Sequence, residues 1–147
     1  MNTTDSINID FYNQPHIVEY LRNSIINNRL AHSYIFSGPE GVGKLAFARR
    51  FISALQCLHP IGELEPCRAC ANCKKIAQNI FVDNLEVTLS EDKAVISIEQ
   101  IREQVLEFAR YGANEARYKS CLIHPAEKMQ VEAMNTLLKI LEEPPQN

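Results

Sequence analysis

Several common sequence features are absent from this chain. No apolar run approaches the roughly 20 residues that cross a bilayer, so the sequence predicts no membrane span. The first residues, Met-Asn-Thr-Thr-Asp-Ser, have neither a basic start nor an apolar stretch, which argues against a secretory signal and favours a cytoplasmic location. Tryptophan is absent, and no internal repeat or low-complexity segment is visible, which excludes repeat architectures.

An excess of basic residues is also missing. Lysine and arginine number 15 against 18 aspartates and glutamates, and the formal net charge is −3. Domains that bind DNA directly usually have a basic excess, so the composition argues against that class. The basic pairs Arg49-Arg50 and Lys74-Lys75 are therefore interpreted as solvated helix faces.

The length and composition predict one compact domain with a small insertion. A chain of 147 residues that is 46% hydrophobic can bury a core. We expect a poorly anchored N-terminus over 1–13 and the domain over 14–147.

Periodicity and turn residues predict the helices and strands of this domain. The helices are expected at 15–28, 44–56, 98–111 and 131–141, the last closed by Pro144-Pro145, and the strands at 33–37, 85–89 and 121–123. This alternation predicts an α/β fold, a parallel sheet flanked by helices. A further strand should follow the last helix, so we expect the chain to be truncated at its C-terminus.

A glycine-rich segment between the first expected strand and its helix matches a phosphate-binding loop. It reads Gly38-Pro39-Glu40-Gly41-Val42-Gly43-Lys44. Glycines let backbone N–H groups curve around a polyphosphate, and the lysine ammonium reaches the outer phosphates. These groups survive here, so ATP or ADP is the expected ligand. A vestigial loop that binds nothing is the alternative.

The groups that would hold Mg²⁺ for hydrolysis are missing. The full loop pattern continues with Ser or Thr, whose hydroxyl ligates the ion, but this chain has Leu45. In ATPases of this type, a strand such as 121–123 ends in two acidic residues, and here His124 and Pro125 follow it. Glu127 is a candidate substitute, although a surface carboxylate at a helix start is the simpler interpretation. We predict no catalytic residue and no significant ATPase activity.

Four cysteines have the spacing of a structural metal site. They are Cys57, Cys67, Cys70 and Cys73, within an insertion over 57–73. Four thiolates complete a tetrahedron around Zn²⁺ and leave no open position, so the site would be structural. Unrelated surface cysteines and a redox pair are the alternatives. Cys121 lies in an apolar strand, which predicts a buried small side chain.

Further segments complete a resemblance to a known family. They are the ten residues Arg-Leu-Ala-His-Ser-Tyr-Ile-Phe-Ser-Gly at 29–38, Ile-Glu-Gln-Ile-Arg at 98–102, Ala-Glu-Lys-Met at 126–129, and Asn-Thr-Leu-Leu-Lys-Ile-Leu-Glu-Glu-Pro-Pro at 135–145. With the loop and the cysteines, they make the chain resemble the AAA+ subunits of the bacterial DNA polymerase III clamp loader, delta-prime and gamma/tau, over most of residues 14–145. The resemblance implies a P-loop NTPase (AAA+) domain that acts in DNA replication.

Departures from the family pattern favour the delta-prime type. In the family, gamma/tau is the working ATPase, with Ser or Thr after the loop lysine and an acidic pair after the second strand. Leu45, His124 and Pro125 break these positions. The resemblance then implies a non-hydrolytic ring component that partners gamma/tau and delta and meets the sliding clamp and primed DNA through the assembly. A gamma/tau-type ATPase is the alternative, and a zinc-bearing nucleic-acid module, disfavoured by the net charge, is a third.

Overall fold

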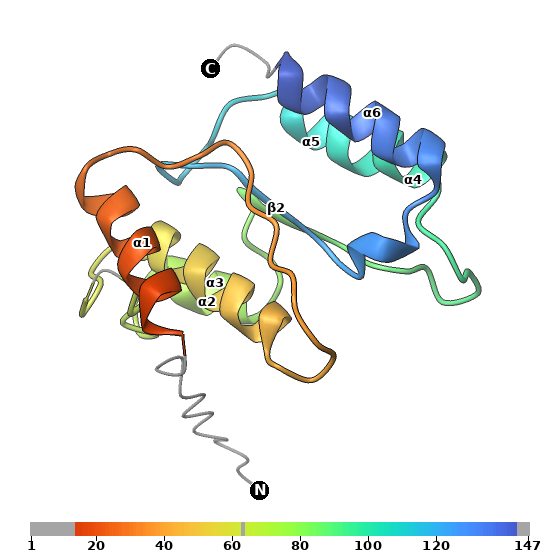
Figure 1. Ribbon diagram of the computed structural model, residues 1–147. Coiled ribbons are helices and arrows are strands. Elements are labelled where there is room, and N and C mark those ends of the chain that lie inside the picture. The colour runs from red at the N-terminus through yellow and green to blue at the C-terminus, as the bar shows by residue number, and fades with distance from the viewer. Residues whose placement is uncertain (1–13, 63, 144–147) are drawn as a thin grey trace, which may run out of the picture.

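The computed structural model describes residues 14–62 and 64–143 (Figure 1). The expectation for residues 1–13 and the two prolines expected to close the last helix lie outside these ranges. Two parallel strands, β1 (Asn84–Val87) and β2 (Ser120–Ile123), run through the middle. Helices α1, α2 and α3 lie on one side of them, and α4, α5 and α6 lie on the other. The expected α/β arrangement is therefore present among the described residues, with a small sheet.

The first two helices follow the predicted periodicity. Helix α1 spans Pro15–Ile26 and has its proline in the first turn, where no intrahelical N–H bond is lost. Helix α2 spans Lys44–Gln56 and buries one face, including Ala48 and Phe51. Both helices thus bury the apolar stripe that the sequence predicts for them.

The segment 33–37 differs from its prediction as a buried strand. It belongs to neither strand of the described sheet, and the Ile35 side chain is 92% exposed. Its aromatic residues nevertheless pack on α2, with the Tyr34 and Phe51 rings 5.4 Å apart edge to face. A strand also needs a neighbouring strand to accept its hydrogen bonds, and within 14–62 and 64–143 none pairs with this segment. The apolar pattern predicted the extended shape but not the missing partner.

The two strands pair in parallel register over four residue pairs, from Asn84↔Ser120 to Val87↔Ile123. Val87 is fully buried and belongs to a core cluster with Ile96, Ile101, Val105 and Ala133. Ile96 extends this layer through an isolated parallel bridge to Met129. The sheet therefore packs its apolar side against the second helical layer.

One continuous helical segment follows Ser97. It consists of α4 (Ile98–Gln100), a π-helical turn η2 (Ile101–Leu106) and α5 (Glu107–Ala109). The Ser97 hydroxyl accepts the backbone N–H of Gln100 at 3.3 Å, which confirms the predicted N-cap. The helix ends before Gly112, as predicted, whereas no pattern in the sequence predicts the π turn.

The remaining helices are α3 (Ala71–Ala77) in the cysteine insertion, the short 3-10 turn η3 (Ala126–Lys128), and α6 (Val131–Glu142). Helix α6 packs against α4 and η2, and Ala133 is its fully buried residue. Among the described residues, no helix combines the length and apolarity needed to cross a membrane.

A buried carboxylate joins the start of β1 to the loop before β2. Asp83 is fully buried, and its two oxygens accept the backbone N–H groups of Asn114, Glu115 and Ala116 at 2.7–2.9 Å. Burial acts to raise the pKa of Asp83, but these three N–H groups outweigh it and hold the pKa below its ordinary value. Asp83 thus ties the loop that precedes β2 to the start of β1, and this holds the two strands in position to pair.

Candidate functional site

The glycine-rich loop turns directly into helix α2. Gly41 and Gly43 have φ of 79° and 90°, values that residues with a Cβ rarely adopt. Gly43 precedes Lys44, the first residue of α2, so the first N–H groups of the helix face the loop. The loop residues themselves are mostly exposed to solvent. This is the geometry in which backbone donors and a helix dipole attract an anion.

The lysine of the loop is folded back over it. Lys44 Nζ donates to the carbonyl oxygens of Gly38 and Pro39, both at 2.7 Å. An ammonium held at the loop entrance is placed to exchange these carbonyls for phosphate oxygens. Leu45 is half-buried in the first turn of α2 and offers no oxygen to a cation.

His124 follows the last residue of strand β2, at one of the two positions where ATPases of this type carry acidic residues. His124 Nε2 lies 2.7 Å from Oε1 of Glu86, on the neighbouring strand β1. Glu127, the candidate substitute, lies in the exposed turn η3, which agrees with a surface carboxylate.

Glu86 is a residue of this region that sequence reasoning did not identify. Arg49 of α2 binds both of its carboxylate oxygens, through Nε at 3.1 Å and through Nη2. The Arg49 hydrogen bond, opposed by burial and assisted by His124, lowers the pKa of Glu86. The only sequence signal was a polar residue between Leu85 and Val87 in an alternating strand. The hydrogen bonds among Arg49, Glu86 and His124 therefore link helix α2 to both strands.

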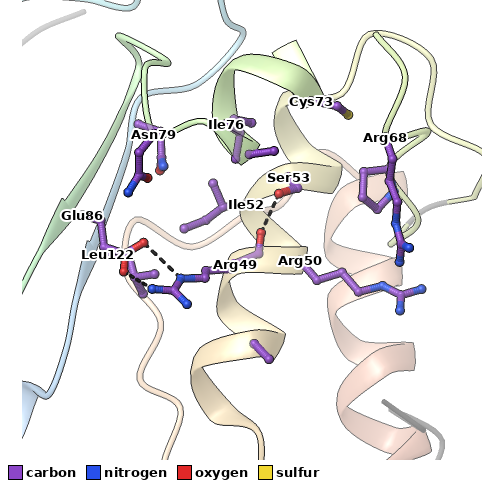
Figure 2. Close-up of a pocket in the computed structure, with 14 residues that line it drawn as sticks. Arg49, Arg50, Ile52, Ser53, Arg68, Cys73, Ile76, Asn79, Glu86 and Leu122 are labelled. Carbon is purple, nitrogen blue, oxygen red and sulfur yellow. Dashed lines mark hydrogen bonds and ion pairs between the residues drawn. The ribbon is translucent and has the colours of Figure 1, made fainter. Parts of the chain in front are cut away.

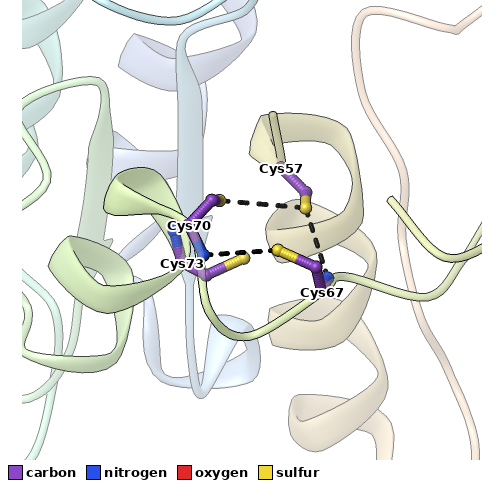
Figure 3. Close-up of side chains that lie close together, drawn as sticks. All are labelled: Cys57, Cys67, Cys70 and Cys73. Atoms are coloured by element: carbon purple, nitrogen blue, oxygen red, sulfur yellow. Dashed lines mark hydrogen bonds between the residues drawn. The ribbon is translucent and has the colours of Figure 1, made fainter. Parts of the chain in front are cut away.

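The four cysteines expected to form a metal site lie together (Figure 3). Their sulfur atoms all lie within 4.8 Å of one another, and those of Cys57 and Cys70 are 3.9 Å apart. Sulfurs bound to one Zn²⁺ at about 2.3 Å in a tetrahedron are separated by about 3.8 Å, so the cluster has a fitting size. The described geometry can therefore hold a metal ion.

Backbone groups also point at these sulfurs. The N–H groups of Cys67, Cys70 and Cys73 donate to the sulfurs of Cys57, Cys67 and Cys70, respectively, at 3.3–3.5 Å. Burial raises the pKa of Cys70, but hydrogen bonds from backbone N–H groups and from neighbouring thiols outweigh it and lower that pKa to about 6. Burial, reinforced by the adjacent sulfurs, raises the pKa of Cys73 to about 12. Binding a cation through all four sulfurs would require each of these thiols to be deprotonated.

The cluster is built onto the end of α2. Cys57 follows the last residue of this helix, and the buried Asn72 side chain donates to the carbonyl of Gln56 at 2.8 Å. Cys121 lies apart from the cluster, on β2, and is exposed. The prediction of a buried residue is therefore wrong for the residue as a whole, although desolvation raises the pKa of the Cys121 thiol to about 12.

Together, the parallel strands, the glycine-rich loop and the helix that starts from it define an α/β protein with a phosphate-loop arrangement. Its sequence identifies it further. The chain belongs to the family described as DNA polymerase III, delta subunit, whose model matches residues 13–147. The predicted resemblance to clamp-loader subunits of this polymerase is thereby confirmed.

Individual relatives include both subunit types that the sequence suggested. The chain is 39% identical over 137 residues to DNA polymerase III subunit tau/gamma of Haemophilus influenzae, covering 93% of this chain and 19% of the relative. It is also 39% identical over 131 residues to subunit delta' of Bacillus subtilis, covering 89% of this chain and 38% of the relative. Equal identities do not separate the two types, and the chain spans well under half of either relative.

A solved structure is also similar in part. It is a DNA polymerase III gamma subunit-related protein from Thermotoga maritima, 28% identical, with a TM-score of 0.39 over 48% of this chain and 25% of that one.

Proposed function

We propose that the protein is a clamp-loader subunit of DNA polymerase III of the delta-prime type, a cytoplasmic ring component that does not hydrolyse ATP itself. The observation that supports the delta-prime type is that the carboxylate nearest the end of β2 is already occupied by other side chains. The carboxylate beside His124 is Glu86, and its oxygens are bound by Arg49 and His124. A carboxylate engaged in this way is a poor ligand for Mg²⁺ and a poor base for water.

The described residues would form part of an AAA+ nucleotide-binding domain over 14–147, with the cysteine insertion as an excursion. Its partners would be the gamma/tau and delta subunits in a hetero-oligomeric ring. The sliding clamp and primed DNA would be met through the whole assembly, since the chain has a net charge of −3.

The nucleotide site would comprise residues 38–45, from Gly38 to Leu45. ATP or ADP would lie with its phosphates against the loop N–H groups and the Lys44 ammonium. Because Leu45 and His124 supply no carboxylate or hydroxyl, binding should depend strongly on Lys44 and only weakly on Mg²⁺.

Turnover and binding test this assignment separately in the full-length protein. We expect no ATP hydrolysis above background, and weaker nucleotide binding in Lys44→Ala than in the control Lys93→Ala, an exposed lysine in another loop. Robust hydrolysis that Lys44→Ala abolishes would instead support the gamma/tau type. Binding that is indifferent to Lys44→Ala would identify a vestigial loop.

The four clustered cysteines would hold one structural Zn²⁺, with Cys121 excluded. The supporting observation is the approach of the four sulfurs together with the N–H groups directed at them. Elemental analysis of the purified protein should give one zinc per chain. Metal-free protein whose melting is unchanged by a chelator would contradict the assignment.

Reconstitution tests the ring assignment. The full-length protein, mixed with gamma/tau and delta, should enter a complex that loads the clamp onto primed DNA. A protein that stays out of the complex, while binding primed DNA tightly by itself, would favour the nucleic-acid module instead.

A further inference from the structure

The four clustered cysteines differ in the elements that carry them and in their exposure to solvent. Cys57 follows the last residue of α2, and Cys70 is the N-cap residue of α3, so these two belong to the ends of different helices. Cys67 lies in the loop between them. These three are partly exposed, whereas Cys73 is buried in the first turn of α3. A dissolved oxidant therefore meets the first three residues before it meets Cys73.

One pair of these thiols is in direct contact. The sulfur atoms of Cys57 and Cys70 lie 3.9 Å apart, and one thiol donates a hydrogen bond to the other. A movement of about 1 Å by each sulfur, within the reach of side-chain rotation, brings the two to bonding distance. Among the described cysteines, this pair therefore combines access to solvent with the approach that a disulfide requires.

We propose that Cys57 and Cys70 are a site of reversible oxidation, where a disulfide links the end of α2 to the start of α3. The oxidant is hydrogen peroxide. One thiolate attacks a peroxide oxygen, the O–O bond breaks and hydroxide leaves, which produces a sulfenic acid. The second thiolate attacks that sulfur, the S–O bond breaks and a second hydroxide leaves. The two sulfurs lose two electrons, which reduce the peroxide, and two protons from solvent convert both hydroxides to water.

The disulfide also has a consequence for metal binding, and this part rests on the proposed zinc site. Oxidation of Cys57 and Cys70 removes two of the four thiolates. A structural Zn²⁺ site uses four ligands, so Cys67 and Cys73 alone do not retain the ion. Formation of the disulfide itself needs only the two cysteines and the oxidant. A small dithiol reverses it by thiol–disulfide exchange.

The disulfide preserves the packing of the two helices, because it joins the same helix ends that the cluster brings together. Helices α2 and α3 contact each other and, with the two strands, line a pocket of about 600 Å³ (Figure 2). Reduced protein without metal has neither a metal link nor a covalent link at this end of α2. Residues 57–73 should therefore stay closed in the oxidised protein and open in the reduced, metal-free protein.

Peroxide treatment of the full-length protein, as purified, tests the proposal. Samples are taken over time, free thiols are blocked with N-ethylmaleimide, and disulfides are mapped by peptide mass spectrometry. Trypsin leaves Cys57 and Cys67 in one peptide, so a glutamate-specific protease is added to separate them. Fragment ions then distinguish Cys70 from Cys73. A chromogenic chelator measures released zinc, and limited proteolysis follows residues 57–73.

We expect the link between Cys57 and Cys70 to be the first disulfide, with one zinc released for each disulfide formed. The oxidised protein should be cut within 57–73 several-fold more slowly than reduced, metal-free protein, and dithiothreitol with zinc should restore the metal. Cys67→Ser should still form this disulfide, whereas Cys57→Ser should not. The control Cys121→Ser, outside the cluster, should behave as wild type.

The proposal is overturned if another pair of cysteines is linked first, or if the oxidised protein is cut as fast as the reduced, metal-free protein. Protein that is purified without zinc but still forms this disulfide would refute the zinc assignment and support the oxidation site. Protein that holds one zinc, and whose Cys57 and Cys70 stay reactive toward N-ethylmaleimide after peroxide, would refute the oxidation site and leave the zinc assignment intact.

Discussion

The buried carboxylate Asp83 offers the sharpest test of what holds the strand pair together. We consider the substitution Asp83→Asn, which keeps the shape but removes the charge and turns one acceptor oxygen into a donor. Three backbone N–H groups, from residues 114–116, point at the two oxygens. In the variant at least one of these donors faces an NH₂ group, with no water in reach because Asp83 is fully buried.

The expected loss of unfolding free energy follows from these contacts. An unsatisfied buried donor costs about 1–3 kcal/mol, and each bond that changes from a charged to a neutral acceptor loses up to ~1 kcal/mol. The unfolding free energy should therefore fall by about 2–4 kcal/mol. The effect should be concentrated at the loop, with faster hydrogen exchange of the amides at 114–116.

The pH dependence gives an independent check. The folded-state pKa of Asp83 is lowered, so its stabilising contribution is present above the ordinary aspartate pKa of about 3.9 and is lost as the pH falls through the lower folded value. The difference in unfolding free energy between wild type and Asp83→Asn should thus be largest at neutral pH and should shrink in strong acid.

Urea unfolding at several pH values, with hydrogen exchange on the same samples, measures both effects. Asp92→Asn is the matched control, since Asp92 is exposed. The reasoning is refuted if Asp83→Asn stays within about 0.5 kcal/mol of wild type at neutral pH, the spread expected for surface substitutions. It also fails if the amides at 114–116 exchange no faster.

Three further predictions concern other parts of the molecule. Glu86→Gln should lower the unfolding free energy by about 1–2 kcal/mol in urea at neutral pH, a loss that fades in acid because the pKa of Glu86 is lowered. Ala133→Leu should cost about 1–3 kcal/mol through overpacking, since Ala133 is fully buried, whereas Val131→Leu, at a 67% exposed position, should be nearly neutral in the same melts. Cys70→Ser should reduce the metal content and expose residues 57–73 to limited proteolysis, while far-UV circular dichroism stays close to that of wild type. Loss of all structure in that variant would show that the cluster supports the whole fold.

Local patterns predicted the helices well because each pattern reports a local cause. The spacing of apolar residues in α1 and α6 records the face that each helix buries, and the Ser97 cap depends on a residue only three positions away. The cysteine cluster was also predictable, since its four residues lie within a span of 17 residues, from Cys57 to Cys73.

Features that depend on distant partners were not predictable. Asp83 meets a loop about 30 residues later, and Glu86 meets Arg49 and His124 from two other elements. No short window of sequence contains such a pair. For the same reason, the apolar run at 33–37 predicts a buried strand that the described sheet does not include, because the composition of a segment says nothing about whether a neighbouring strand is present.

The position of the cysteine cluster along the chain affects the order in which the protein can form during synthesis. Closing the cluster requires a loop of 17 residues, complete once Cys73 has emerged from the ribosome, whereas the sheet needs both β1 and β2 and waits until Ile123. Short loops close at low entropic cost, and chains fold from the N-terminus as they are made. The cluster can therefore close on the end of α2 before β1 and β2 are able to pair.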